Sequence, residues 1–263
     1  MKKRLIICFL FLGLLNISLK GQDILSGEKI VAEEESVSTP FFSAIVGWTF
    51  PQGDMLKSYK SFMHLGANLG WKTYSNWVWM VEFGFGFGSD NAKEKDEILS
   101  NMMTSPNDGF VISSEGSDAG VVAFNRNLSI GVKVGKLFTL SSKRPNSGIL
   151  FQVGGGFLQH QIIYQSTLEI AKQLEGDYAY LYDRQKRGFS LSVFLGYMHL
   201  GRENFTNFYA GIEINQAWTF LTREYQINYN DSYNRVFNDR TITIKAGWLF
   251  PFYGRKADKE YYY

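Results

Sequence analysis

A bulky apolar residue occupies every second position along residues 77–88. A period of two places successive side chains on opposite faces of a β-strand, so this segment is predicted to be a strand. One face is bulky throughout, whereas the opposite face carries Glu82 and three glycines. The bulky face consists of Trp77, Trp79, Val81, Phe83, Phe85 and Phe87.

Seven further segments show the same period. It is clear in residues 63–72, 128–135, 189–197 and 241–250, and less clean in residues 42–50, 148–164 and 208–224. The pattern therefore predicts an all-β chain with eight strands.

The glycines decide between two all-β architectures. A soluble sandwich would turn the bulky face inward and the other face to water, where glycine weakens a strand. A narrow closed barrel has little room inside, so glycine, serine and a few paired charges suit its lumen, and the bulky face then meets lipid. We therefore predict a closed eight-stranded antiparallel transmembrane β-barrel over residues 41–253, located in an outer membrane.

The predicted connections alternate in length. The long ones are residues 51–60, 89–124, 165–187 and 225–239, and the short ones are residues 73–76, 139–147 and 201–207. Outer-membrane barrels place long loops outside and short turns in the periplasm. The same arrangement is predicted here, with short helical insertions in the outer loops.

The N-terminus is typical of an exported protein. Residues 1–22 combine a basic start, an apolar run over residues 5–15 and a polar end, as a cleaved signal peptide does. Residues 23–40 are expected to form a polar periplasmic segment, and residues 254–263 a short periplasmic tail. Cys8, the only cysteine, lies inside the signal, so the mature chain has no disulfide.

Composition narrows the function classes. Hydrophobic residues make up 45% of the chain and aromatic residues 16%, which excludes a disordered chain. The longest apolar run has 11 residues, too short for a spanning helix of about 18 or more.

Four of the 27 basic residues leave with the signal while all 25 acidic residues remain, so 23 − 25 gives a net charge of −2 for the mature chain. A nucleic-acid partner is therefore not expected.

Two segments resemble a known group of proteins. Residues 241–253 (TITIKAGWLFPFY) alternate and end in aromatics, and residues 180–215 (YLYDRQKRGFSLSVFLGYMHLGRENFTNFYAGIEIN) add a second stretch. Both look like parts of small eight-stranded outer-membrane barrels of the Bacteroidota type. Residues 254–263 after the aromatic end depart from that pattern. The resemblance implies a fold and a location rather than an activity.

Charged residues on the small faces of the strands are candidate lumen groups. They form either an ion path or a paired polar core, and the core is favoured because side chains fill an eight-stranded barrel. Buried charges need partners, and Glu82 beside Lys133 could supply one pair. The candidate lumen network is His64, Lys72, Glu82, Lys133, Glu213 and Lys245.

Aromatic residues near the strand ends are expected to form girdles at both boundaries between lipid and water. The predicted girdle residues are Trp71, Tyr74, Trp77, Tyr197, Trp248, Phe250 and Phe252.

The sequence offers little catalytic chemistry. The three histidines are isolated from other ligand-type residues, so neither a metal nor a cofactor is expected. The His-x-Ser pair of lipid-A deacylase barrels is absent, and Asp231–Ser232 with His64 is only a faint match to lipid-A palmitoyltransferases. We therefore expect no enzyme activity.

The outer loops are the most distinctive remaining feature. Residues 91–103 are predicted to be helical behind an Asn91 cap, and a capping box at Ser166 and Glu169 predicts a helix through Leu174 that stops at Gly176. The apolar loop residues either fold over the barrel mouth or dock a partner. These possible partner-contact residues are Ile98, Leu99, Met102 and Met103.

The leading hypothesis is a non-enzymatic barrel that serves as a structural or partner-binding subunit of an outer-membrane assembly. Its expected partners are outer-membrane lipid and other outer-membrane or surface proteins, with protein-insertion and type IX secretion machinery as candidates from the resemblance. The alternative is a narrow pore for small solutes, and the remote alternative is a lipid-A-modifying enzyme.

Overall fold

A computed structural model describes residues 35–89, 92–105, 109–201, 206–228 and 235–252. The predicted signal peptide, most of the segment 23–40, the tail 254–263, Asn91 and the pair Asp231–Ser232 lie outside these residues. Among the described residues, no helix is long and apolar enough to cross a membrane.

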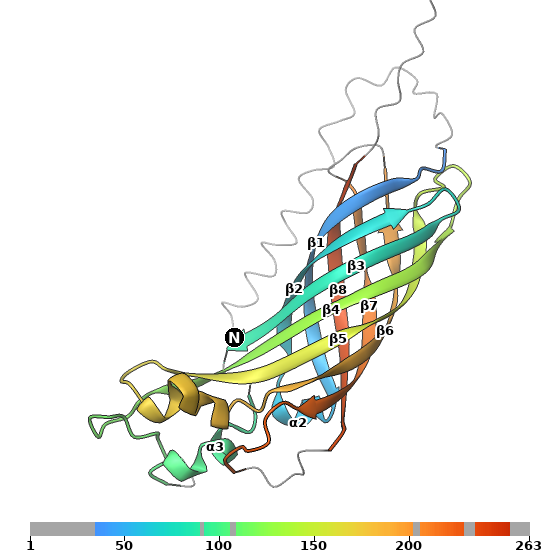
Figure 1. The fold of residues 1–263 in the computed structure, drawn as a ribbon. Helices are drawn as coiled ribbons and strands as arrows, with labels where there is room; N and C mark the ends of the chain where they lie inside the picture. The colour runs from blue at the N-terminus through green and yellow to red at the C-terminus, as the bar shows by residue number, and fades with distance from the viewer. Residues whose placement is uncertain (1–34, 90–91, 106–108, 202–205, 229–234, 253–263) are drawn as a thin grey trace, which may run out of the picture. The chain divides into compact units, whose positions relative to one another are not determined.

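Eight antiparallel strands form a closed barrel in which each strand pairs with the next and β8 pairs back to β1 (Figure 1). This confirms the predicted fold. The strands are β1 (Thr39–Gly53), β2 (Phe62–Lys72), β3 (Trp77–Ser89), β4 (Val121–Thr139), β5 (Gly148–Ser166), β6 (Lys186–His199), β7 (Phe208–Leu221) and β8 (Phe237–Pro251).

The two ends of the barrel differ in their connections. Residues 73–76, 140–147 and 200–207 join strands at the short-turn end, where β1 begins and β8 ends. The other four connections, three of them longer, lie at the opposite, long-loop end, together with helices α2 (Met55–Ser58) and α3 (Lys95–Ile98) (Figure 1). Three short 3-10 helices complete the loops: η1 (Ser100–Met102), η2 (Lys172–Leu174) and η3 (Gly176–Leu181).

Several strands extend further toward the long-loop end than the alternation predicts. The strand predicted from residue 128 begins at Val121, and the strand predicted from residue 241 begins at Phe237. In these extensions the outward face carries polar residues such as Arg126 and Arg240, and on β4 it also carries Phe124. The difference in polarity between the two faces therefore weakens in the extensions, although the hydrogen-bonded pairing of the strands continues through them.

The two predicted loop helices are borne out only in part. Residues 91–103 contain the short helices α3 and η1, whereas the helix predicted to open at Ser166 does not form there. Ser166 ends β5 instead of opening a helix, and its hydroxyl accepts a hydrogen bond from the Ala171 N–H at 3.3 Å. Glu169 accepts hydrogen bonds from Ser113 and Ser117, so its carboxylate ties two loops together instead of capping a helix. Gly176 begins η3 rather than stopping a helix. Contacts between loops that are distant in sequence outweigh the local helix-capping preferences in this region.

The outward face of the barrel is a broad apolar belt. Its large exposed side chains are contributed by all eight strands. All six tryptophans of the chain belong to it, and none of them enters the lumen: Trp48, Trp71, Trp77, Trp79, Trp218 and Trp248.

The interior is divided into layers. At the short-turn end an apolar plug fills the lumen, in contrast to the small or polar interior that the sequence predicts. At the long-loop end a second apolar cluster, the cap core, joins the loops to the strand ends. The plug consists of Phe41, Ile45, Val78, Met80, Leu137, Leu150, Phe194, Met198, Leu200, Tyr209 and Leu249.

Inward-facing glycines make room for the rings of the plug. A Cβ atom at Gly70 would lie 2.3 Å from the Phe41 ring, and one at Gly247 would lie 2.2 Å from the Tyr209 ring. No real Cβ contact is that short, so a side chain at either position would displace the neighbouring ring. The alternation of bulky residues with glycine is therefore a packing requirement of the narrow lumen.

Candidate functional site

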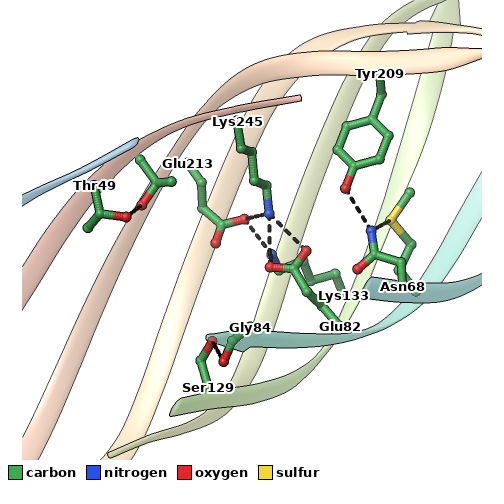
Figure 2. A network of polar contacts seen from close by, with 11 residues as sticks. Thr49, Asn68, Glu82, Gly84, Ser129, Lys133, Tyr209, Glu213 and Lys245 are labelled. Atoms are coloured by element: carbon green, nitrogen blue, oxygen red, sulfur yellow. Dashed lines mark hydrogen bonds and ion pairs between the residues drawn. The ribbon is translucent and has the colours of Figure 1, made fainter. Parts of the chain in front are cut away.

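Four of the six predicted lumen residues meet at the centre of the barrel (Figure 2). They come from four different strands: Glu82 from β3, Lys133 from β4, Glu213 from β7 and Lys245 from β8. We call this group the ion-pair cage. His64 lies outside it and packs its ring against Gly84, where a Cβ atom would lie 2.5 Å from the imidazole.

The cage is a closed ring of alternating charges (Figure 2). Lys133 pairs with Glu82 at 2.8 Å and also with Glu213. Lys245 pairs with Glu82 at 2.8 Å and with Glu213 at 2.6 Å. Each charge thus contacts two opposite charges, and the group is neutral overall.

Burial makes this neutrality essential. The four side chains are between 2% and 12% exposed, so water gives them little solvation. An isolated charge in such a site costs several kcal/mol, whereas an ion pair with good geometry recovers most of that cost. The cage therefore closes the middle of the lumen at a tolerable energetic cost.

Polar contacts continue from the cage toward the plug. The hydroxyl of Tyr209 lies 2.7 Å from the amide of Asn68 (Figure 2). In the amide orientation that satisfies both groups, Tyr209 donates to the Asn68 oxygen and the Asn68 nitrogen donates to Glu82 at 3.2 Å. The ion-pair cage and the apolar plug are thus one continuous packed unit.

A small polar cavity adjoins the cage. The side chains that line it include Glu82, Lys133, Glu213, Ser129 and Ser190. A cavity of this polarity suits water, which can hydrogen-bond to the lining groups. It ends at the cage, and the plug blocks the lumen beyond.

Lys72 lies at the short-turn end instead of in the cage. Its Nζ donates to the carbonyl of Val37 at 3.0 Å and to Oδ1 of Asn146 at 3.0 Å. Asn146 also accepts from the Val37 N–H at 2.9 Å. This lysine therefore fastens the segment before β1 and the β4–β5 turn across the end of the barrel.

A second buried polar cluster, which the sequence does not predict, lies near the long-loop end. The Tyr59 hydroxyl is 3.0 Å from Nδ1 of His160, and Nε2 of His160 is 2.9 Å from Asp239. The Thr219 hydroxyl donates to the same carboxylate at 2.5 Å. These residues come from the β1–β2 connection and from β5, β7 and β8, so sequence spacing gives no signal for the group.

This cluster resembles a catalytic relay in composition but not in accessibility. Tyr59, His160 and Asp239 are each at most 1% exposed. Burial raises the pKa of the Tyr59 hydroxyl well above its ordinary value, so the tyrosine remains a protonated donor. The hydroxyl therefore donates to His160 Nδ1, and the Nε2–H donates to Asp239. The arrangement locks the first outer connection to the barrel wall.

The outer loops fold over the mouth. Ile98 and Leu99 are buried in the cap core, and Met102 and Met103 pack against it partly buried. The interpretation of these four residues as a partner contact is therefore wrong for Ile98 and Leu99, because the cap core already uses their apolar surface. Asn91, the proposed helix cap, lies outside the described residues.

Polar contacts hold the cap loops to one another. Arg223 makes a two-pronged ion pair with Asp183, at 2.9 Å and 2.7 Å. The guanidinium of Arg184 donates to the carbonyls of Ile227 and Asn228 at 2.7 Å and 2.8 Å. The β5–β6 and β7–β8 connections are thus joined into one structured cap.

Asp54 fastens the β1–β2 connection to β8. Its carboxylate accepts from the Asn238 N–H at 3.0 Å and pairs with Lys57 at 3.2 Å and Arg235 at 3.6 Å. Burial acts to raise the pKa of Asp54, but the Asn238 N–H and the two cations outweigh it and hold the pKa below its ordinary value.

The predicted aromatic girdle residues mark one end of the barrel instead of both. All seven residues lie at the short-turn end, so the expectation that they mark both boundaries is wrong. The end of one strand and the start of the next lie at the same end of the barrel. Proximity to a strand end in the sequence therefore does not tell which end of the barrel a residue occupies. Aromatic residues toward the long-loop end come from other positions: Trp48, Phe50, Phe189, Trp218 and Phe220.

Metal chemistry finds no support in the described residues, which contain no group of three or more histidine, cysteine, aspartate or glutamate side chains able to hold an ion. The pair Asp231–Ser232 lies outside them.

No protein-family model and no curated protein matches the chain. The similar solved structures include three small barrels. Neisserial surface protein A is 12% identical and covers 82% of this chain and 99% of its own, with a TM-score of 0.46. Ail, the attachment invasion locus protein of Yersinia pestis, in complex with the heparin analogue sucrose octasulfate, is 10% identical and covers 81% and 99%, with a TM-score of 0.37. The N-terminal β-barrel domain of Pseudomonas aeruginosa OprF is 9% identical and covers 80% and 97%, with a TM-score of 0.33.

Proposed function

We propose that this protein is a non-enzymatic integral outer-membrane barrel that serves as a structural or partner-binding subunit of an outer-membrane assembly. The observation that carries the proposal is the sealed interior: plug, ion-pair cage and cap core occupy successive levels of the lumen. A barrel without a passage contributes its surfaces instead.

The apolar belt supports membrane embedding. Large apolar side chains cover the outward face of every strand, whereas the acidic residues of the strands (Glu82, Glu213 and Asp239) face inward. In water such a belt would be an extended aggregation surface, and in a bilayer it is the lipid contact. Lipids with brominated acyl chains should quench most of the tryptophan fluorescence, because all six tryptophans are outward. Quenching no greater than in water-exposed controls would contradict the embedding.

The cap supplies the proposed partner surface. Ile112, Leu168 and Ile170 are exposed on adjacent loops, and the Ser114 N–H donates to the Ile170 carbonyl at 3.0 Å. An apolar patch held on ordered loops is typical of a protein contact. Protein-insertion and type IX secretion machinery are the candidate assemblies, on the strength of the sequence resemblance.

Purification in mild detergent tests the proposal. Wild-type protein should retain a protein partner in a fixed molar ratio. The triple variant I112S/L168S/I170S should lose it, while the control L56S, at another exposed apolar loop position, should keep it. Recovery of the folded barrel alone, without a stoichiometric partner, would contradict the proposal.

The polar cavity beside the cage favours a narrow pore as the second candidate. Conduction would require the cage to open and the plug to move. Planar-bilayer recordings should show discrete conductance if the pore exists, and a silent membrane containing inserted protein would eliminate it.

A further inference from the structure

Charged residues on the outward face of the strands are unevenly distributed. Four are basic, and no strand carries an outward-facing acidic residue. Three of the four lie toward the long-loop end: Arg126 on β4, Arg187 on β6 and Arg240 on β8. The fourth, Lys136, lies near the short-turn end, with its Nζ 5.6 Å from the Trp77 ring centroid.

The three arginines lie on the outward face, in the part of the apolar belt toward the long-loop end. Each occupies the next outward-facing position beyond a large apolar side chain: Leu128 before Arg126, Phe189 before Arg187 and Ile242 before Arg240. Other strands carry neutral polar residues on the outward face near this level, although Ile163 follows Gln159 on β5 and Trp218 follows Gln216 on β7. Together these residues form the polar rim: Gln52, Ser89, Arg126, Gln159, Arg187, Gln216 and Arg240.

Each rim arginine has a glutamine directly across from it on a neighbouring strand. Arg126 is opposite Gln161, and Arg187 is opposite Gln159. Arg240 is opposite Gln216 and donates to its side-chain oxygen at 2.9 Å. Glutamine offers hydrogen bonds but no negative charge, and no described residue forms an ion pair with any of the three arginines.

We propose that the rim arginines bind the phosphate groups of anionic lipid in the leaflet at the long-loop end. A guanidinium holds a phosphate through two parallel hydrogen bonds, and the neighbouring glutamine amide can donate a further one. The lipid's acyl chains then lie against the apolar belt directly below. This inference rests on the membrane embedding proposed above, but not on a protein partner.

The charge asymmetry separates this site from ordinary solvation of arginine at a membrane surface. Snorkelling explains how the long stem of an arginine lets its charge reach water from the belt, but it supplies no counter-charge for the guanidinium. The rim excludes acids and leaves its cations uncompensated. A basic residue near an anionic leaflet strengthens attraction roughly fivefold, so three together give on the order of a hundredfold.

Native mass spectrometry of the full-length, detergent-folded barrel tests the assignment. The probes are lipid A with two phosphates and the same lipid with its phosphates removed. Wild-type protein should bind the phosphorylated lipid roughly a hundredfold more tightly. The variant R126Q/R187Q/R240Q should lose that preference, K136Q should keep it, and arginine-to-lysine replacement should keep part of it.

Three results would overturn the proposal. One is equal binding of the two lipids by wild-type protein, and another is an unchanged preference in the triple variant. The third is displacement of the lipid by inorganic phosphate at equal concentration, which would identify a site for free phosphate. A gel-mobility shift on heating confirms that each variant is folded. Membrane embedding has its own readout in tryptophan quenching, so its failure is distinguishable.

Discussion

Replacing Lys245 with methionine removes one cation from the ion-pair cage and leaves two carboxylates facing one lysine. Lys245 is the least exposed member, at 2%, and contacts Glu82 at 2.8 Å and Glu213 at 2.6 Å. Methionine has a similar length and fills most of the space. The variant therefore tests charge rather than packing.

The expected loss follows from the geometry. At an effective dielectric constant of about 20, an ion pair about 4 Å apart contributes roughly 4 kcal/mol. Lys245 makes two such contacts, opposed by repulsion from Lys133 and by the cost of burying its own charge. Removing one partner of a buried pair costs about 3–5 kcal/mol, and we expect K245M to fall in that range.

A second substitution should restore most of the stability. In K245M/E213Q the remaining pair of Glu82 and Lys133 is neutral again. The double variant should unfold within about 1–2 kcal/mol of wild type, since neutral replacement of a buried pair is often tolerated. The non-additivity should then exceed about 2 kcal/mol.

Denaturant unfolding from lipid vesicles, followed by gel mobility and tryptophan fluorescence, measures these free energies. K136M is the matched control, because that lysine faces outward and its loss should cost less than about 1 kcal/mol. A K245M cost no greater than the control's, or a double variant equal to the sum of its singles, would refute the cage as a cooperative unit.

Three further predictions use the same measurements. G247A should lose about 1–3 kcal/mol through overpacking of the plug, while G155A, where a Cβ meets only ordinary contacts, should be neutral; equal costs would argue against a packing role. Y59F should lose about 1–3 kcal/mol because His160 keeps a buried nitrogen without a donor, and an unchanged midpoint would contradict the hydrogen-bond chain. Asp54 has a lowered folded-state pKa, so its contribution is complete above about pH 4 and is lost as the pH falls through the folded value. Protection factors for hydrogen exchange in α2, which are corrected for the intrinsic pH dependence of exchange, should fall over that interval in wild type and stay constant in D54N.

The fold could be read from the sequence because the barrel imposes a period of two on every strand. Bulky residues had to face lipid and glycines had to face a crowded lumen, so the two faces differ at Trp77–Ser89 more strongly than in most sheets. The cage residues could be predicted for the same reason, because a charged residue on the small face of a strand points into the lumen.

The period of two does not predict which side chains contact one another inside the barrel. The plug contains Phe41 and Phe194, which look like interruptions of the small face until the neighbouring glycines are seen to make room for them. Tyr59, His160 and Asp239 meet through three separate elements, so their proximity depends on register around the closed barrel. The helix predicted from Ser166 and Glu169 failed because contacts between loops outweighed local capping preferences.

The cage also bears on how the barrel assembles. Glu82 and Lys133 lie on the adjacent strands β3 and β4, while Glu213 and Lys245 lie on the adjacent strands β7 and β8. Each hairpin thus carries one acid and one base of the cage before β8 reaches β1, so neither hairpin brings a net charge to the cage. Closure adds the contacts between the hairpins to the pairs within them. An insertion pathway that brings in one hairpin at a time therefore never has to bury an unpaired cage charge.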